Sequence, residues 1–112
     1  MKNNILALFT MLTLIACDKK LPPINPDIIS EKVPHDTDDP AIWVYPSDPS
    51  KSIVFGTDKD TNGAIYAFDL QGKIIPEKVI KNIKYTNNID LEYGFRLNDS
   101  TTTEIIVFTE RE

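Results

Sequence analysis

The sequence predicts an all-β protein, and three observations lead to this fold class. Short apolar segments of the kind that form strands recur from Ala41 to Thr109, turn residues separate them, and no stretch shows the spacing of an amphipathic helix. Several short strands with regular turn signals are typical of sandwiches, barrels and propellers. We therefore expect the regular structure of this chain to consist of strands.

Six strands are expected, and the turn residues between them set their ends. The run Pro46-Ser47-Asp48-Pro49 favours a turn after the first strand, and Asn62-Gly63 is a hairpin signal before the third. Gln71-Gly72 ends the third strand. The expected strands are Ala41–Tyr45, Ser52–Thr57, Ala64–Leu70, Lys73–Ile80, Ile89–Phe95 and Glu104–Thr109.

The third expected strand carries apolar side chains on both of its faces. Alternation puts Tyr66 and Phe68 on one face and Ile65 and Ala67 on the other. Such a strand suits a sheet that is covered on both sides, as in a propeller whose blades stack around a channel. A small sandwich satisfies the same pattern, so the alternation leaves both architectures open.

Residues 1–16 have the features of a secretory signal peptide. Lys2 supplies a positive start, and the apolar run 5–16 that follows is too short to form a stable membrane-spanning helix. The next residue, Cys17, ends a Leu-Ile-Ala-Cys string that resembles a bacterial lipoprotein processing box. Cys17 is the only cysteine, so no internal disulfide is possible and we expect its thiol to carry a lipid anchor. The expected location is the bacterial cell envelope, at the outer membrane or the cell surface.

Residues 17–32 are expected to form a spacer between the lipid anchor and the folded domain. Pro22, Pro23 and Pro26 occur there without a periodic apolar pattern, which favours an extended chain. The folded domain is then expected over residues 33–112, a length that is small for an independent hydrophobic core.

The chain is acidic, which narrows the classes of partner. It has 12 Lys and Arg against 17 Asp and Glu, a formal net charge of −5, and loss of Lys2 with the signal peptide makes the balance 11 against 17, or −6. Nucleic-acid binding relies on clustered basic residues, which do not occur here, so nucleic acid is not the expected partner. The excess of carboxylates fits cation binding, with an anionic substrate reached through the cations.

The run His35-Asp36-Thr37-Asp38-Asp39-Pro40 is the most informative feature of the sequence. Three carboxylates fall within four residues, and Pro40 stiffens the backbone where they meet the first expected strand. Neighbouring carboxylates repel one another unless a cation, water or basic groups offset their charge, and calcium binds clusters of oxygen ligands. The alternative is an exposed acidic turn at the start of a strand.

The string Asp38-Asp39-Pro40-Ala41-Ile42-Trp43 resembles the opening blade of the β-propeller phytases. Three further segments follow in the order that this family shows, and the resemblance covers residues 33–112; the segments are Gly56-Thr57-Asp58-Lys59, Asn87-Asn88-Ile89-Asp90 and Ile105 to Arg111. It implies a six-bladed β-propeller that is monomeric at full length. This chain is then its N-terminal part, about one blade and the start of the next.

The family resemblance also implies an activity. Phytases of this family release phosphate from phytate, myo-inositol hexakisphosphate, with calcium ions in the site. Bound calcium neutralises an anionic substrate, polarises a phosphoryl oxygen and activates a water molecule, so no nucleophilic side chain is required.

The resemblance implies roles for five residues, and a sixth, Asp36, adjoins them. Asp38 and Asp39 match the acidic pair of the family, as catalytic residues and calcium ligands, and Asp36 lies close enough to add a further ligand. Asp90 matches the acid of the Asn-Asn-x-Asp segment and is expected in the catalytic site. Two basic residues match positions that bind substrate phosphate: Lys59 and Arg111.

Two readings other than an active enzyme stay open. Asp60 and Glu92 stand where basic or polar residues are common in the family, and this loss of positive charge favours a surface-anchored propeller that binds ligands without turnover. The third reading is an inactive truncated product, because a site completed by later blades cannot form from 112 residues. We expect this fragment alone to be inactive.

Overall fold

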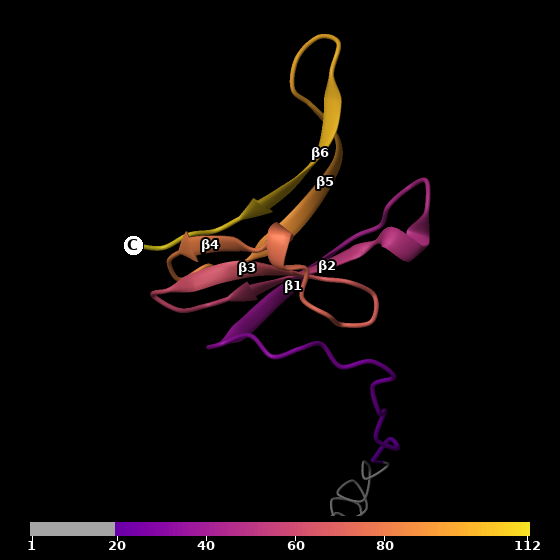
Figure 1. The fold of residues 1–112 in the computed structure, drawn as a ribbon, viewed down its shortest axis with the longest axis vertical. Coiled ribbons are helices and arrows are strands. Elements are labelled where there is room, and N and C mark those ends of the chain that lie inside the picture. Colours follow the sequence, from indigo (N-terminus) through magenta and orange to yellow (C-terminus); the bar gives the residue numbers. More distant parts are fainter. Residues whose placement is uncertain (1–19) are drawn as a thin grey trace, which may run out of the picture.

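The computed structural model describes residues 20–112, which form six strands in two antiparallel sheets (Figure 1). The first sheet has the order β1–β2–β3–β4, with β1 at Thr37–Trp43, β2 at Ile53–Asp58, β3 at Gly63–Phe68 and β4 at Ile80–Ile83. The second pairs β5 (Ile89–Arg96) with β6 (Thr102–Phe108). Two short 3-10 turns, η2 (Pro49–Lys51) and η3 (Pro76–Lys78), are the only helical elements of this range. The predicted all-β class is confirmed, whereas Cys17 and the predicted signal peptide lie outside the described residues.

The first strand begins at Thr37 rather than at Ala41, so the acidic run is part of the sheet. Thr37 pairs with Asp58 of β2, and the register then shifts before Pro40 pairs with Gly56. A proline cannot donate to a sheet ladder and is tolerated at edge strands and irregularities. The edge strand β1 therefore carries its acidic residues at an irregular point of the ladder.

The prediction of a strand over Lys73–Ile80 is wrong. Only Ile74 forms an isolated bridge, to Phe68, and the chain then turns through η3 before β4 begins at Ile80. Pro76 explains the difference, because its ring fixes φ and removes the N–H that a strand would use, while the first position of a helical turn tolerates both.

The hydrophobic core lies between the two sheets. Its buried centre comes from β3, β4 and β5, and side chains of β1, β2 and β6 pack against it; the residues are Ile65, Ile83 and Ile89, with Ala41, Phe55, Ile106 and Phe108 around them. Ile65 is fully buried, and burying an aliphatic side chain of this size stabilises a fold by about 1.5–3 kcal/mol. The β5–β6 hairpin is thereby docked on one face of the first sheet.

The hairpin bends away from the four-stranded sheet toward its tip (Figure 1). The β5–β6 register shifts between Glu92 and Phe95, and Gly94 within this bulge has φ +69°, a conformation that favours glycine. Two hydrogen bonds tie the hairpin to the end of β1: Trp43 Nε1 donates to Glu104 at 2.6 Å, and the Val44 N–H donates to the Tyr93 hydroxyl at 2.8 Å.

The segment before β1 contacts the sheet through Glu31. Its N–H donates to the Gly72 carbonyl at 2.8 Å, and its carboxylate accepts the Ile74 N–H at 2.7 Å and pairs with Lys73 Nζ at 3.2 Å. The hydrogen bond from Ile74, followed by that from Lys73, lowers the pKa of the Glu31 carboxyl. Residues around Glu31 are therefore held on the loop that follows β3. No helix within residues 20–112 has the length and hydropathy to cross a membrane.

Candidate functional site

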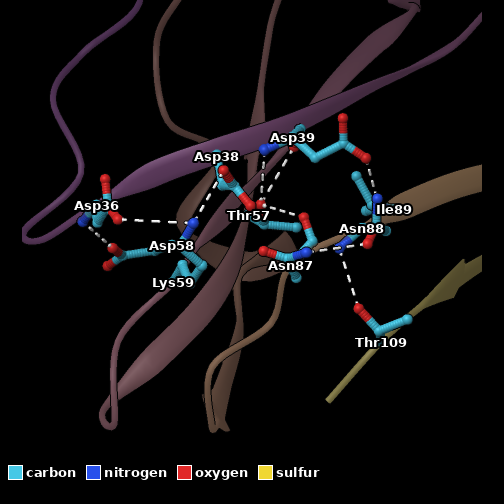
Figure 2. A network of polar contacts seen from close by, with 10 residues as sticks. All are labelled: Asp36, Asp38, Asp39, Thr57, Asp58, Lys59, Asn87, Asn88, Ile89 and Thr109. Atoms are coloured by element: carbon cyan, nitrogen blue, oxygen red, sulfur yellow. Dashed lines mark hydrogen bonds and ion pairs between the residues drawn. The ribbon is translucent and has the colours of Figure 1, made fainter. Parts of the chain in front are cut away.

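The start of β1, the end of β2 and the segment before β5 come together and hold most of the predicted site residues (Figure 2). Antiparallel pairing of Thr37 with Asp58 puts the acidic run beside the end of β2. A hydrogen bond from Ile89 then brings the start of β5 to the same place. Residues more than 50 positions apart along the chain thus form one polar group.

Asp39 connects the two sheets. Its Oδ2 accepts the backbone N–H of Ile89 at 3.0 Å, while its own N–H donates to Thr57 Oγ1 at 2.9 Å (Figure 2). A carboxylate that accepts a backbone N–H forms a charge-assisted bond, which is stronger than one between neutral groups. The Asp39 carboxylate is therefore held by β5, and the Asp39 backbone is held by β2.

Thr57 of β2 holds the backbones of Asp39 and Asn87 together. It is fully buried, and its hydroxyl lies 3.3 Å from the Asp39 carbonyl and 3.4 Å from the Asn87 carbonyl, in addition to accepting the Asp39 N–H. Sequence reasoning missed this role, since a threonine in a strand is ordinary. The only signal was its place in the Gly-Thr-Asp-Lys string.

Asp39 and Asp90 line one open pocket of about 290 Å³. Asn88 and Thr109 line it too, and the Asn88 N–H donates to Thr109 Oγ1 at 3.0 Å (Figure 2). Asp90 is exposed, and its Oδ1 accepts the N–H of Leu91 at 2.8 Å. Two carboxylates, an amide and a hydroxyl are thus gathered along the wall of one pocket.

Asp38 and Asp36 contact Lys59 instead. Lys59 Nζ lies 3.1 Å from Asp38 Oδ1 and 3.9 Å from Asp36 Oδ2 (Figure 2). These side chains are half-buried to exposed, so each pair contributes no more than about 1 kcal/mol. The structure therefore separates the predicted acidic pair, with Asp38 at the ammonium of Lys59 and Asp39 at the pocket beside β5.

Asp58 is a buried carboxylate that sequence reasoning missed. It accepts the N–H of Asp36 and the Nδ1–H of His35, each at 2.8 Å. Burial raises the pKa of the Tyr66 phenol, and the negative charge of Asp58 raises it further. The string that contains Asp58 was the available signal, but a buried position could not be read from it.

Arg111 follows β6 in the chain and contacts the loop between β4 and β5. Its N–H donates to the Lys84 carbonyl at 3.1 Å, and its guanidinium carbon lies 5.8 Å from the centre of the Tyr85 ring. Tyr85 has φ 46°, an uncommon conformation for a residue with a side chain, and its N–H donates to the Asp60 carbonyl at 2.8 Å. The loop thus places Arg111 near the turn that follows Lys59, without a contact to Lys59 itself.

The side chains at the pocket offer the oxygen ligands that calcium prefers, but there are too few of them for a complete coordination shell. Calcium prefers oxygen ligands and takes about six to eight of them, and the side chains of Asp39, Asp90, Asn88 and Thr109 offer oxygen. Within residues 20–112, however, no three Asp, Glu, His or Cys side chains converge closely enough to hold a metal ion. A calcium ion at this pocket would need further ligands from water or from residues outside this range.

Comparison with known proteins gives a consistent result. The sequence model of the phytase family matches residues 20–112. A curated relative, the 3-phytase of Bacillus subtilis (strain 168), is 41% identical over 61 residues, which are 54% of this chain and 15% of that protein. The chain therefore spans a small part of the length of this relative. No solved structure matches this chain significantly.

Proposed function

The chain belongs to the phytase family, and from this premise we propose that the protein hydrolyses phytate and releases inorganic phosphate with calcium in its site. The match over residues 20–112 carries the proposal. The pocket that Asp39 and Asp90 line supports it, because a phosphatase that uses metal-activated water needs carboxylates on an accessible surface.

Asp39 and Asp90 are the residues that we propose to hold a calcium ion at the pocket. Asp36 and Asp38, which lie apart from the pocket at Lys59, are proposed ligands of a second calcium ion. Calcium bound there would supply charge neutralisation, polarisation of a phosphoryl oxygen and activation of a water molecule. Asp39 is prepared for this role, because Ile89 and Thr57 fix its carboxylate and its backbone before any ligand arrives. Asn88 and Thr109 add polar groups at the same wall.

Lys59 and Arg111 are the residues that we propose to bind substrate phosphate. The ammonium of Lys59 is held by Asp38 and Asp36, which are themselves proposed calcium ligands. A cation that takes these two carboxylates would compete with the ammonium and leave Lys59 available to phosphate. Arg111 presents a planar fork of donors that suits phosphate oxygens.

The proposed setting is the bacterial cell envelope. We propose that residues 1–16 are removed, that Cys17 carries the lipid, and that residues 17–32 link it to a domain that begins near residue 33 and forms the N-terminal part of a six-bladed propeller, monomeric at full length. Two consecutive antiparallel sheets with a shared core support this architecture.

Phosphate release from phytate tests the proposal. The protein expressed from the complete gene and the 112-residue chain are each assayed with calcium and with a chelator in its place. The proposal predicts release by the complete product with calcium only. If the complete product binds phytate but releases no phosphate, the protein is a binding module; if it does neither, it is an inactive relative of the family.

A further inference from the structure

Asp58 stands out among the charged residues because its carboxylate is buried and touches neither the pocket nor Lys59. It ends β2, its side chain is 1% exposed, and two donors satisfy it: the Asp36 N–H and His35 Nδ1–H. A buried carboxylate is costly unless hydrogen bonds compensate it, and bonds of this charge-assisted kind do so. Both donors belong to the segment that enters β1, so Asp58 is placed to hold that segment.

The contacts of Asp58 and Lys59 hold Asp36 at both of its backbone polar groups. The Asp36 N–H donates to the Asp58 carboxylate at 2.8 Å (Figure 2), and the Asp36 carbonyl accepts the Lys59 N–H at 2.7 Å. Asp58 and Lys59, at the end of β2, thus clamp Asp36, which directly precedes β1. The segment that enters β1 cannot shift along β2 without losing both bonds.

This clamp sets where the acidic side chains lie. With the backbone of Asp36 fixed, the carboxylates of Asp36 and Asp38 reach Lys59 Nζ at 3.9 and 3.1 Å. An amide in place of the Asp58 carboxylate removes the negative charge that strengthens both bonds. Its oxygen can still accept the Asp36 N–H, but its NH₂ group can bond His35 Nδ1 only when the ring takes the other tautomer. Both contacts are then weaker, and the segment is held less firmly.

We propose that Asp58 is a positioning residue, which fixes Asp36, Asp38 and Lys59 for binding of calcium and phosphate without touching either. The inference rests on the proposed function, because it assigns these three residues to ligand binding. Partners that orient metal-binding groups from behind typically change affinity or activity by about 10–100-fold when they are replaced.

Asp58→Asn in the protein from the complete gene tests this inference, with Asp69→Asn as its matched control. Asp69 also accepts two N–H groups, those of Gln71 and Lys73, both on Oδ1 at 2.9 Å, so its asparagine variant keeps both bonds and controls for the loss of the charge. It follows β3 at the end of the sheet where Val54 pairs with Phe68, whereas Asp58 lies at the end where it pairs with Ala64. The substitution is the same, and only one of the two positions adjoins the proposed site.

Four quantities are measured for each variant: KM and kcat for phytate at saturating calcium, the Kd of calcium alone by calorimetry, and the melting temperature. We expect Asp58→Asn to raise KM or the calcium Kd about tenfold or more and Asp69→Asn to leave both unchanged. A lower melting temperature with unchanged KM and Kd would show that Asp58 is structural only and would overturn the inference.

Three further outcomes are decided with the same measurements. If Asp58→Asn does not fold, His35→Ala removes one of the two donors and keeps the carboxylate; it should shift KM or Kd in the same direction, and unchanged values overturn the inference. If the wild-type protein releases no phosphate from phytate, the proposed function fails, and the calcium Kd of the variants alone decides the role of Asp58. A wild-type protein that binds no calcium either would overturn both.

Discussion

The carboxylate of Asp39 accepts the backbone N–H of Ile89 at 3.0 Å, which joins the edge strand of the first sheet to the first residue of the second. The same side chain lines the pocket that it shares with Asp90. A residue proposed for ligand binding is therefore also a contact between the sheets. The pocket exists only when the hairpin is docked, so the stability of this contact and the integrity of the site are coupled.

Asp39→Ala is expected to destabilise the protein by about 1–3 kcal/mol, because the Ile89 N–H loses a charged acceptor. Asp39→Asn retains an oxygen that can accept this bond and should cost less. The free energy of unfolding from urea titrations measures both. An alanine variant as stable as the wild type would mean that this bond does not hold the sheets together.

Thr57→Val is expected to cost about 1–3 kcal/mol, since the Asp39 N–H would be left without its buried acceptor while the shape of the side chain stays nearly the same. Thr57→Ser keeps the hydroxyl and serves as the control. Urea titration compares the two. A valine variant as stable as the wild type would show that the hydroxyl of Thr57 does not stabilise the fold.

Acid is expected to release the segment around Glu31. The folded pKa of Glu31 is lowered from its ordinary value of 4.5, first by the Ile74 N–H and then by Lys73, so its contribution is complete above about pH 4.5 and disappears as the pH falls through the lower folded pKa. Protection of the Ile74 amide from hydrogen exchange, relative to the intrinsic rate at each pH, should fall in this window. In Glu31→Gln this protection should not change across the same window, and a change that persists would assign the effect to another group.

Gly72→Ala is expected to displace the same segment. Gly72 has φ +79°, and a Cβ there would lie 2.9 Å from the Ile29 carbonyl oxygen and 2.9 Å from the Cα of Ser30. Gly94→Ala is a matched control, because Gly94 has φ +69° but open space around its Cα. Both variants should lose about 1–2 kcal/mol from the left-handed conformation, and the overlap should add about 1–3 kcal/mol at Gly72 alone. Equal losses of unfolding free energy would contradict the docking of residues 29–30.

The fold class and five of the six strands could be predicted from the sequence, because turn chemistry and alternation are local properties. Asn62-Gly63 marked the start of β3, and Ile65 proved to be the buried centre of the core. The strand expected over Lys73–Ile80 does not form. The segment is apolar enough for a strand, but Pro76 has no N–H for a sheet ladder and begins the turn η3 instead.

The residues of the site could be predicted from the sequence, but their arrangement in space could not. Motif resemblance supplied Asp39 and Asp90, which the fold brings to one pocket. The separation of Asp38 from Asp39 depends on the irregular register between Thr37 and Pro40, which is a property of pairing with β2. The role of Asp58 likewise depends on its burial beside Asp36, 22 residues away in the chain, and no local pattern encodes that contact.

Phosphate release from phytate by Asp39→Asn, assayed with calcium in the protein from the complete gene, tests the central claim most directly. The amide can still accept the Ile89 N–H, so the sheets stay docked while the negative charge at the pocket is lost. We expect release to fall at least about 100-fold, with Asp69→Asn retaining the wild-type rate. Wild-type release by Asp39→Asn would contradict the assignment of this pocket as the calcium site.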